Sequence, residues 1–363
     1  MAMEPPYRAW LEVDLGALWA NYALLSARAK GEVIPVLKAE AYGHGALPLA
    51  RFLLGRGVRR VAVATLGEAR ALRRGGVGGE VLLLGSLHPL EAEEALALGL
   101  VPTLSTLEAA RALAQRARAL GLTPRAHLKV DTGMNRVGFP WREALAALRA
   151  VEALGVRVEG VYSHLATAGE DPSFVEVQRA RFLEVQRALG PGYLYHLENS
   201  HGLLLHGGEN ARVGLALYGL IPGFGLRPVL RLLARPTLVK RLERGARVGY
   251  GGEYVARGGE WLATLPVGYA DGLPRGAVRG VKGPDGSLLP VAGRISMDQT
   301  TVLLPAPVDL GAVFEVVGPD FGPTGLCALA EARGTIPYEV AVHLSRRLPR
   351  LYLLEGRVVE RVE

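Results

Sequence analysis

The hydrophobic pattern alternates between two kinds of segment over residues 33–217. Short apolar runs bounded by glycine, proline or polar residues are typical of buried parallel strands, and longer runs with helical spacing of apolar residues predict amphipathic helices. The expected strands are Val33–Leu37, Arg60–Ala64, Glu80–Leu84, Val101–Leu104, Arg125–Val130, Val158–His164, Leu194–Glu198 and Ala211–Leu217. The expected helices include Pro89–Leu98, Thr106–Leu120, Arg142–Leu154 and Phe174–Leu189.

Eight such strand–helix units within about two hundred residues predict an α/β fold that closes into a (β/α)8 TIM barrel. A doubly wound sheet would also alternate, but no GxGxxG motif follows the first strand. We expect an earlier strand, Trp10–Asp14, to be followed by a helix, Leu15–Ala29.

The pattern changes after about Pro228, where short strand-like runs are separated by clusters of Gly, Pro and Asp. The expected strands here are Pro236–Leu242, Glu260–Pro266, Thr300–Leu304 and Val313–Val317, and a helix, Pro337–Arg347, and a strand, Leu351–Leu354, end the chain. We therefore expect a barrel domain over residues 1–228 and a β-rich domain over residues 229–363. The first strand, near residues 8–14, could pack with the β-rich domain.

Composition narrows the class of protein. Of the 363 residues 49% are hydrophobic, yet no apolar run is long enough to span a membrane. The start, MAMEPPYRAW, has no apolar signal core, so we expect a cytoplasmic protein. The net charge of +7 comes from scattered arginines and forms no dense basic tract, which argues against nucleic-acid binding. The single cysteine, Cys327, excludes an internal disulfide, and no metal site is expected.

Candidate chemistry begins at Lys38, which ends the first strand of the expected barrel, at the edge where α/β barrels carry their active sites. The chain has only five lysines, so a generic surface role for this one is disfavoured. Tyr42, Gly43 and Gly45 follow and supply a hydroxyl and backbone that can approach a ligand closely. Polar groups also end four later strands, in the segments Lys129–Arg136, Tyr162–His164, Glu198–Gly202 and Arg212–Leu215. Each alone has a structural explanation, such as a helix cap; their convergence on one rim favours a ligand site.

Three motifs carry a resemblance to a known family. VLKAEAYGHG (36–45) resembles the cofactor-lysine motif of the alanine racemases, barrel enzymes that use pyridoxal phosphate. GYADG (268–272) is similar to their catalytic-tyrosine motif, and GRISMDQ (293–299) to a further signature. The resemblance runs from Trp10 to Tyr352. The chain departs from the family pattern at Glu40, where asparagine is usual, at Ser296, where cysteine is common, and at Arg346, where some members have tyrosine.

The resemblance implies an enzyme that interconverts L-alanine and D-alanine by a two-base mechanism through a pyridoxal phosphate aldimine, supplying D-alanine for peptidoglycan. Lys38 would form the imine and serve as one base, which requires a lowered pKa, and Tyr269 would be the other base. The resemblance also implies a homodimer with shared active sites, because the Tyr269 and Met297 segments reach the barrel of a second subunit.

The remaining roles are assigned by the same resemblance. A dianionic phosphate favours N–H and hydroxyl donors, for which Tyr42, Asn199, Ser200, Gly214 and Leu215 are suitable. Arg212 would face the pyridine nitrogen, and His164 and Arg212 would contact the catalytic tyrosine. The substrate carboxylate would be held by Arg136 and the Met297 N–H, with Lys129, carbamylated in some members, and Asp298 in support.

Other functions stay open on the sequence. One is a broader racemase that also accepts serine. A barrel-type pyridoxal phosphate decarboxylase usually has a catalytic cysteine, and Cys327 lies outside every matched motif. A non-catalytic pyridoxal phosphate carrier would lack the β-rich domain that contains GYADG.

Overall fold

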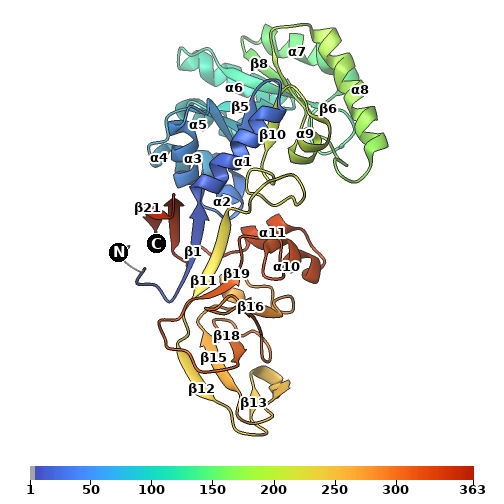
Figure 1. The fold of residues 1–363 in the computed structure, drawn as a ribbon. Coiled ribbons are helices and arrows are strands. Elements are labelled where there is room, and N and C mark those ends of the chain that lie inside the picture. The colour runs from blue at the N-terminus through green and yellow to red at the C-terminus, as the bar shows by residue number, and fades with distance from the viewer. Residues whose placement is uncertain (1–4) are drawn as a thin grey trace. The chain divides into compact units, whose positions relative to one another are not determined.

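The structure is a computed structural model that describes residues 5–363, and the chain divides into two compact units (Figure 1). The barrel unit comprises residues 22–41 and 46–217. The β-rich unit comprises residues 5–21, 42–45 and 218–363. The chain thus crosses between the units several times, and the domain boundaries expected at residues 228 and 229 stay a prediction.

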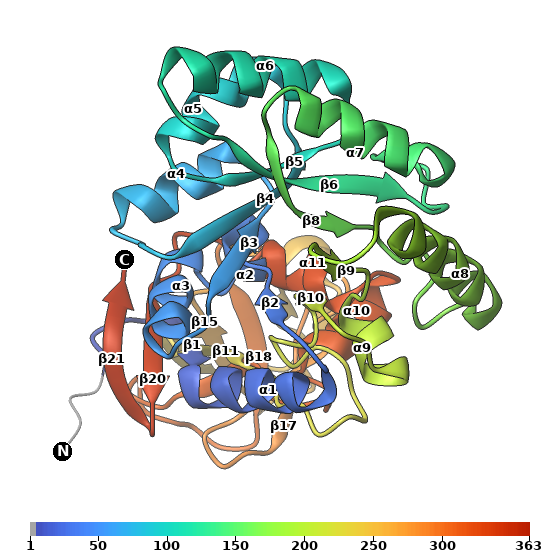
Figure 2. The same ribbon diagram turned by 90° about the horizontal axis from the view of Figure 1, so that it is seen from above.

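Parallel strands form the barrel unit, as expected. They are β2 (Val33–Pro35), β3 (Arg60–Val63), β4 (Glu80–Ser86), β5 (Val101–Leu104), β6 (Arg125–Asp131), β8 (Arg157–Tyr162), β9 (Leu194–His196) and β10 (Ala211–Val213). The strands β3-β4-β5-β6-β8-β9 form one continuous ladder and β10 pairs with β2. Single parallel bridges, Val36 with Ala62 and Glu198 with Ala211, join the two groups into a ring. Figure 2 shows this barrel from above, with its helices outside the strands. The expected (β/α)8 fold is confirmed.

The helices of the barrel unit follow the strands. They are α1 (Leu15–Arg28, which begins in the β-rich unit), α2 (Lys38–Tyr42, which ends there), α3 (Ala46–Gly55), α4 (Leu66–Arg74), α5 (Ala92–Ala97), α6 (Leu107–Ala119), α7 (Ala144–Ala153), α8 (Pro172–Leu189) and α9 (Ser200–His206). Short 3-10 turns, Pro89–Glu91 and Trp141–Glu143, and the two-residue strand β7 (Phe139–Pro140) complete it. Capping explains where several helices start: Asp171 accepts hydrogen bonds from Ser173 N and Phe174 N ahead of α8, and Pro172 occupies its first turn.

A chain of ion pairs joins residues near the starts of several barrel strands. Arg60, only 4% exposed, lies 2.9 Å from carboxylate oxygens of both Glu32 and Glu80. Arg125 continues the chain, 3.0 Å from Glu80 and 3.2 Å from Glu159. This balance of charges is necessary because an uncompensated buried carboxylate is strongly destabilising.

The β-rich unit is built on a seven-stranded sheet in the order β17-β16-β19-β11-β1-β20-β21. These strands are β1 (Ala9–Asp14), β11 (Leu230–Ala234), β16 (Gly280–Lys282), β17 (Leu288–Pro290), β19 (Phe314–Val317), β20 (Arg350–Leu354) and β21 (Arg357–Val362). A second sheet contains β12 (Leu238–Arg241), β15 (Trp261–Leu265) and β18 (Thr300–Leu304), and β13 (Arg247–Val248) pairs with β14 (Tyr254–Val255). Two helices, α10 (Leu326–Arg333) and α11 (Pro337–Val342), and 3-10 turns at Tyr250–Gly252 and Tyr269–Asp271 complete the unit. The early strand β1 lies between β11 and β20, so it belongs to this sheet.

The last expected helix, Pro337–Arg347, is wrong in its second half, because α11 ends at Val342. The carbonyls that follow are held by a side chain instead of by helical N–H groups. The Arg350 guanidinium donates to the carbonyl oxygens of Leu344, Ser345 and Leu348 at 3.1–3.3 Å. It also donates to the Gly43 carbonyl at 3.1 Å. Arg350 is 6% exposed, so satisfying these donors outweighs another helical turn.

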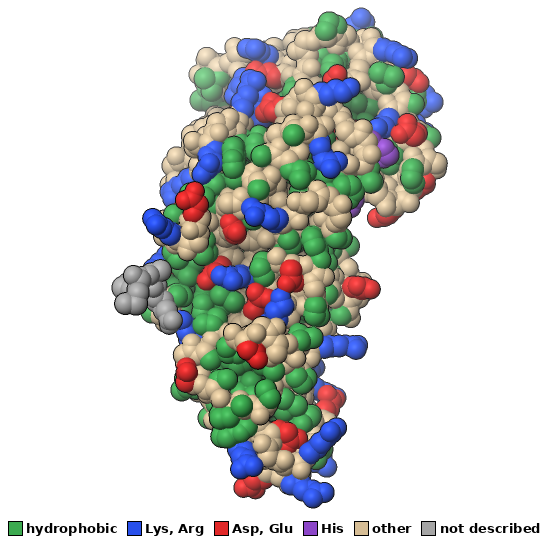
Figure 3. Space-filling model, in the orientation of Figure 1, with side chains coloured by type: hydrophobic (Ala, Val, Ile, Leu, Met, Phe, Trp, Pro, Cys, Tyr) green, Lys and Arg blue, Asp and Glu red, His purple; other side chains and the backbone are tan. Residues whose placement is uncertain are grey.

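Lys and Arg side chains are spread over the face in Figure 3 with Asp and Glu among them, in agreement with the scattered charges of the sequence. Within residues 5–363 the structure has no helix with the length and apolar character needed to cross a bilayer.

Candidate active site

Lys38 begins a short left-handed helical turn. The four residues that follow it, Ala39–Tyr42, all have φ between 50° and 54°. For residues other than glycine this conformation costs about 1–2 kcal/mol each, because the Cβ approaches the carbonyl oxygen. Strain of this kind persists only where surrounding contacts impose it, and it concentrates at functional sites. The turn directs the chain abruptly away from strand β2 just after Lys38.

Glu68 anchors the start of this turn. Its Oε1 accepts a hydrogen bond from Ala39 N at 2.6 Å, and its Oε2 accepts from Ala64 N at 2.8 Å and Thr65 N at 3.1 Å. Thr65 completes a capping box by accepting from Glu68 N, so the carboxylate is held rigidly at the first turn of α4. Glu68 therefore connects the lysine segment to the end of the neighbouring strand β3.

The electrostatic surroundings of Lys38 favour its neutral amine. Loss of hydration is the main cause that lowers the pKa of Lys38, and the positive charge of Arg136 lowers it further. The side chain is nevertheless accessible to solvent. A lowered pKa increases the neutral fraction of this accessible amine, and the neutral amine is the form that can act as nucleophile or base.

Arg136 lies in the loop after β6, and an aspartate shapes that loop. Asp131 Oδ1 accepts hydrogen bonds from Gly133 N at 2.8 Å and from Asn135 N at 3.2 Å. Asn135 adopts a left-handed conformation with φ 53°, which asparagine tolerates better than most residues. The exposed Arg136 side chain is close enough to lower the pKa of Lys38, Lys129 and His164.

Arg212 is the buried centre of the rim. Its guanidinium donates to His196 Nδ1 and O at 2.7 Å, to Ser163 O at 2.7 Å, to His164 Nδ1 at 3.1 Å and to Leu197 O at 3.4 Å. Burial lowers the pKa of Arg212 to about 10, so the side chain stays protonated at neutral pH. It is thus a fixed cation held mainly by neutral acceptors.

The hydrogen bonds of Arg212 determine the tautomers of two histidines. Arginine can only donate, so His196 Nδ1 accepts and His196 Nε2 carries the proton. That proton is donated to His127 Nδ1 across 2.9 Å. Burial and the neighbouring arginines lower the pKa of His127 to about 3 and that of His196 well below its ordinary value, so both rings are neutral. The barrel interior therefore orients Arg212 without a carboxylate in the hydrogen-bond chain.

Lys129 is the second unusual lysine. It is 5% exposed, and burial together with the charges of Arg212 and Arg136 lowers its pKa well below the ordinary value. Its Nζ lies 4.7 Å from the centre of the Tyr162 ring, and the Arg212 guanidinium lies 4.8 Å from the same ring. Tyr162 also stacks on His196 with 4.6 Å between ring centres. The aromatic ring thus compensates part of the positive charge that gathers here.

Ser200 joins the loops after the last two strands. Its Oγ accepts hydrogen bonds from Gly214 N at 3.2 Å and Ala216 N at 3.1 Å. Because both bonds use oxygen lone pairs, the hydroxyl proton is left to donate to another acceptor. Asn199 caps α9 by accepting from Gly202 N at 2.9 Å, and Leu215 lies between the two N–H groups held by Ser200.

The second group of expected residues lies in the β-rich unit. Tyr269 N donates to Ser296 O at 3.1 Å and Ala270 N to Met297 O at 2.9 Å, so the two signatures lie side by side. A Cβ at Gly268 would come within 2.4 Å of Met297 O, which explains the glycine. Tyr269 is 43% exposed and Met297 53%.

One arginine ties these signatures together. Arg347 donates to both carboxylate oxygens of the buried Asp271, at 2.7 and 3.0 Å, and to Asp298 at 2.7 Å. Asp271 Oδ2 in turn accepts from Gly268 N at 2.8 Å. Asp298 therefore supports the segment through Arg347.

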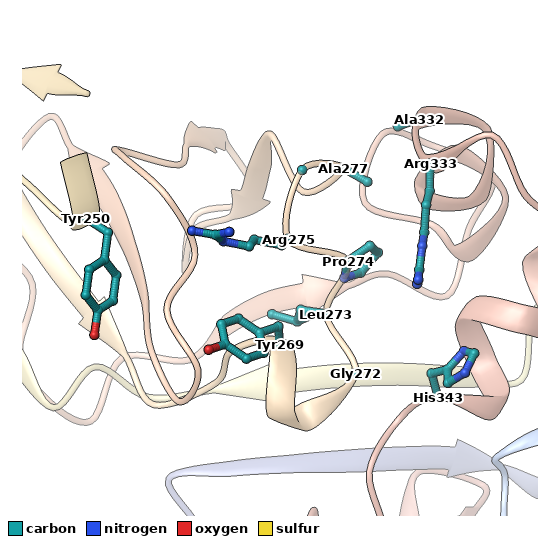
Figure 4. A pocket seen from close by; sticks show the side chains of 11 residues that line it. Tyr250, Tyr269, Gly272, Leu273, Pro274, Arg275, Ala277, Ala332, Arg333 and His343 are labelled. Atoms are coloured by element: carbon teal, nitrogen blue, oxygen red, sulfur yellow. The ribbon is translucent and has the colours of Figure 1, made fainter. Parts of the chain in front are cut away.

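An open hollow of about 940 Å³ lies beside Tyr269, with Tyr250, Arg275, Arg333 and His343 among its lining residues. Figure 4 shows the Tyr269 side chain extending into this space from its short 3-10 turn.

Tyr42 lies elsewhere in the same unit. Its ring centre is 5.1 Å from that of Tyr218 and 6.1 Å from that of Tyr338, and burial raises the pKa of Tyr42. The structure thus divides the expected residues into a barrel group and a β-rich group that includes Tyr42, Tyr269, Met297 and Asp298.

Comparison with known proteins identifies the family. The sequence model of the family described as alanine racemase, N-terminal domain, matches residues 13–222. The sequence model of the alanine racemase C-terminal domain matches residues 229–352. The chain belongs to the alanine racemase family. Members of this family are isomerases. The chain is 39% identical over 366 residues to the alanine racemase of Symbiobacterium thermophilum, and the alignment covers 94% of this chain and 96% of that relative.

Solved alanine racemase structures agree with this assignment. The enzyme from Bacillus anthracis with bound L-Ala-P superposes with a TM-score of 0.89 at 33% identity, over 99% of each chain. A histidine racemase from Leuconostoc mesenteroides subsp. sake superposes with a TM-score of 0.86 at 29% identity, over 97% of this chain and 100% of that one. The alanine racemase fold is therefore shared by enzymes named for different amino acids.

Sequence reasoning missed several residues of the barrel group. Glu68 could have been found from its capping box, Thr65-x-x-Glu68, directly after strand β3. His196 and His127 lie inside strands and gave no motif. Gln178 is a polar residue on the buried, otherwise apolar face of α8. This interruption of the apolar spacing of the helix could have been noticed in the sequence.

Proposed function

We propose that this protein racemises alanine with pyridoxal phosphate, using Lys38 and Tyr269 as the two bases. The observation that supports this best is the rim of the barrel, where an accessible lysine of lowered pKa lies within the electrostatic reach of Arg136. D-alanine is a precursor of peptidoglycan, so we propose that the enzyme serves its synthesis in the cytoplasm.

The residues of the barrel group fit pyridoxal phosphate. Ser200 has a hydroxyl proton left to donate, as a phosphate requires, and Gly214 and Leu215 supply backbone beside it. Arg212 can face a pyridine nitrogen, and because arginine keeps its proton, that nitrogen would stay unprotonated. Asn199 adds an amide next to Ser200 in the sequence, and His164 orients Arg212 from the rim. Tyr42, of the β-rich group, would add a further hydroxyl.

Bound pyridoxal phosphate withdraws electrons from the α-carbon of an amino acid and so makes its α-proton acidic. Lys38 would accept or return that proton at Nζ, because partial desolvation and the positive charge of Arg136 lower its pKa toward the neutral form. Tyr269 supplies a hydroxyl oxygen for the opposite face of the α-carbon. Two groups on two faces are needed because each direction of racemisation requires one base and one acid.

The substrate carboxylate requires a cation and N–H donors. We propose Arg136 and the Met297 backbone for this role, with Asp298 holding the Met297 segment through Arg347. Lys129 is a buried amine with two arginines near it, and its neutral form is the one that reacts with carbon dioxide. A carbamate there would place a negative charge beside Arg136.

The substrate test uses purified protein loaded with pyridoxal phosphate. Incubation with L-alanine, L-serine, L-lysine and L-histidine, followed by chiral chromatography, should yield D-alanine fastest. Faster formation of D-serine or D-histidine would show that serine or histidine, and not alanine, is the preferred substrate. Release of carbon dioxide would favour a decarboxylase. Absence of turnover with all four amino acids would favour a carrier.

Cofactor attachment provides an independent prediction. Reduction of the loaded protein with borohydride should leave a pyridoxyl group on Lys38, since its amine is accessible and has a lowered pKa. Peptide mass mapping reads the position directly. A label on the surface lysine Lys240 or on Lys129 would contradict the assignment, and Lys240→Arg is the matched control that should leave labelling unchanged.

We further propose a homodimer in which the Tyr269 segment of one subunit completes the barrel site of the other. Mixing inactive Lys38→Ala and Tyr269→Phe proteins under conditions of subunit exchange would then restore activity. Random exchange makes half of the dimers mixed, each with one intact site, so about a quarter of the wild-type activity is expected. No recovery after exchange has been verified by native mass spectrometry would mean that each site uses one chain only.

A further inference from the structure

Gln178 is a fully buried amide on the inner face of helix α8. It is 0% exposed, and the other buried residues of that face, Val175, Phe182 and Val185, are apolar. Burying an amide costs free energy unless its donors and acceptor are all satisfied. A hydrophobic residue would pack at this position without that requirement, so the partners of Gln178 indicate what the amide does.

All three partners of the amide lie in loops at the rim of the barrel. Ala166 N donates to Gln178 Oε1 at 2.8 Å, which fixes the orientation of the amide because a backbone N–H can only donate. Gln178 Nε2 then donates to His164 O at 3.0 Å and to Thr132 Oγ1 at 3.2 Å. One side chain therefore connects the loop after β6 with the loop after β8.

These contacts lead directly to groups of the proposed site. Thr132 is the first residue beyond β6 in the loop that carries Arg136, and its hydroxyl also contacts Ser163 Oγ at 2.8 Å. Ser163 O and His164 Nδ1 both accept from the Arg212 guanidinium. Gln178 thus holds the loop of Arg136 in register with the strand end that orients Arg212.

Neighbouring residues of α8 strengthen the same connection. Arg181 donates to Thr132 O at 2.8 Å, and Arg179 pairs with Glu198 at 2.8 Å, just before Asn199 and Ser200. Among the described residues of α8, Gln178 is the one whose side chain bonds to both loops.

We propose that Gln178 is a positioning residue that sets the relation between Arg136 and the His164–Arg212 pair, and thereby the affinity for the substrate carboxylate. This inference rests on the proposed racemase function. It makes α8, a helix that contributes no group to the reaction, responsible for the geometry of two rim loops.

Gln178→Glu tests this with almost no change of shape. A carboxylate cannot donate, so the oxygen that replaces Nε2 would face the His164 carbonyl with two acceptors in contact. Burial raises the pKa of such a carboxyl group, and its protonated form regains one donor. At about pH 9 we expect KM for L-alanine to rise about tenfold, the factor that corresponds to one lost buried hydrogen bond, with a smaller change in kcat. At about pH 6 the ratio to wild type should approach one.

The matched control is Gln186→Glu, the same substitution two turns later on α8, where the side chain is half-buried and has no rim partner among the described residues. Its KM should equal that of the wild type at both pH values. An equal KM for Gln178→Glu and wild type at about pH 9, or a defect independent of pH, would overturn the positioning role.

Hydrogen exchange gives a readout that does not depend on turnover. In Gln178→Ala protein, peptides covering residues 131–138 and 163–168 should exchange faster than in wild type, while peptides of the β-rich unit stay unchanged. A uniform increase over the whole chain would mean general destabilisation and would contradict the inference. If wild-type protein fails to racemise any amino acid, the proposed function fails, and the exchange pattern still decides whether Gln178 holds the two loops.

Discussion

Replacing Tyr269 by Phe is expected to remove most racemisation in both directions while exchange of the α-proton of one enantiomer survives. The substitution deletes only the hydroxyl of a side chain that is 43% exposed, so the fold and cofactor binding should persist. Each direction of racemisation uses one base and one acid, so both rates fall together. A positioned acid–base group contributes about 10²–10⁴-fold, which is the expected size of the loss.

The asymmetry should appear in heavy water. We propose that Tyr269 takes the α-proton of L-alanine and that Lys38 takes the α-proton of D-alanine. The variant should therefore still incorporate deuterium at the α-carbon of D-alanine through Lys38. It should incorporate hardly any deuterium into L-alanine. The equilibrium constant between enantiomers in solution stays at one, so proton NMR of the exchange, and not the final composition, is the measurement.

Tyr193→Phe is the matched control, because its hydroxyl donates to Glu152 at 3.0 Å in the barrel unit, and Glu152 is not among the expected site residues. It should exchange and racemise as wild type. Equal residual exchange from both enantiomers in Tyr269→Phe would show that Tyr269 is not the second base, and His164 would then be the next residue to test.

Replacing Arg60 by Ala is expected to lower the free energy of unfolding by about 3–5 kcal/mol, the usual cost of leaving a buried charge without its partner. Arg60 is 4% exposed and contacts Glu32 and Glu80, which are 20% and 12% exposed. Urea denaturation near neutral pH measures the loss. Arg149→Ala, at an exposed position of helix α7, is the control and should change stability little.

The pH dependence of that loss has a defined sign. Burial already raises the pKa of Glu32, even with Arg60 beside it, and removal of the cation raises it further. Below the unfolded pKa of about 4.3, the Glu32 carboxyl group is protonated in both the folded and the unfolded protein, so its raised pKa costs no stability. The loss in free energy of unfolding develops as the pH rises through the folded pKa. Arg60→Ala should therefore be closest to wild type at acidic pH. A deficit that grows on acidification would contradict the proposed role of Glu32.

The barrel was predictable from the sequence because its strands are buried on both faces and therefore read as continuous apolar runs. Each run coincides with a strand to within a few residues, although Leu194–Glu198 and Ala211–Leu217 form ladders over only β9 and β10 before they turn into the rim loops. Helix α10 and the end of α11 were not predicted. The end of α11 depends on tertiary contacts, as the Arg350 bonds to Leu344 and Leu348 demonstrate.

The site was predictable to the extent that barrel topology brings strand ends together. Lys38, Arg136, His164 and Arg212 end different strands, so one rim was expected from their positions alone. Glu68, His196 and Gln178 act through hydrogen bonds to groups distant in sequence, which no local pattern records. Gln178 does interrupt an otherwise apolar helix face, and an amide at such a position indicates that the helix has polar partners to satisfy.

The left-handed turn after Lys38 has a consequence for how the enzyme matures. Alanine and glutamate do not favour this conformation in a free peptide, and here the hydrogen bond from Ala39 N to Glu68 helps to impose it. The desolvation that lowers the pKa of Lys38 also exists only in the closed barrel. An unfolded or nascent chain therefore carries an ordinary, protonated lysine at this position, with no greater affinity for aldehydes than any other. The lowered pKa of Lys38 is therefore acquired only with tertiary structure.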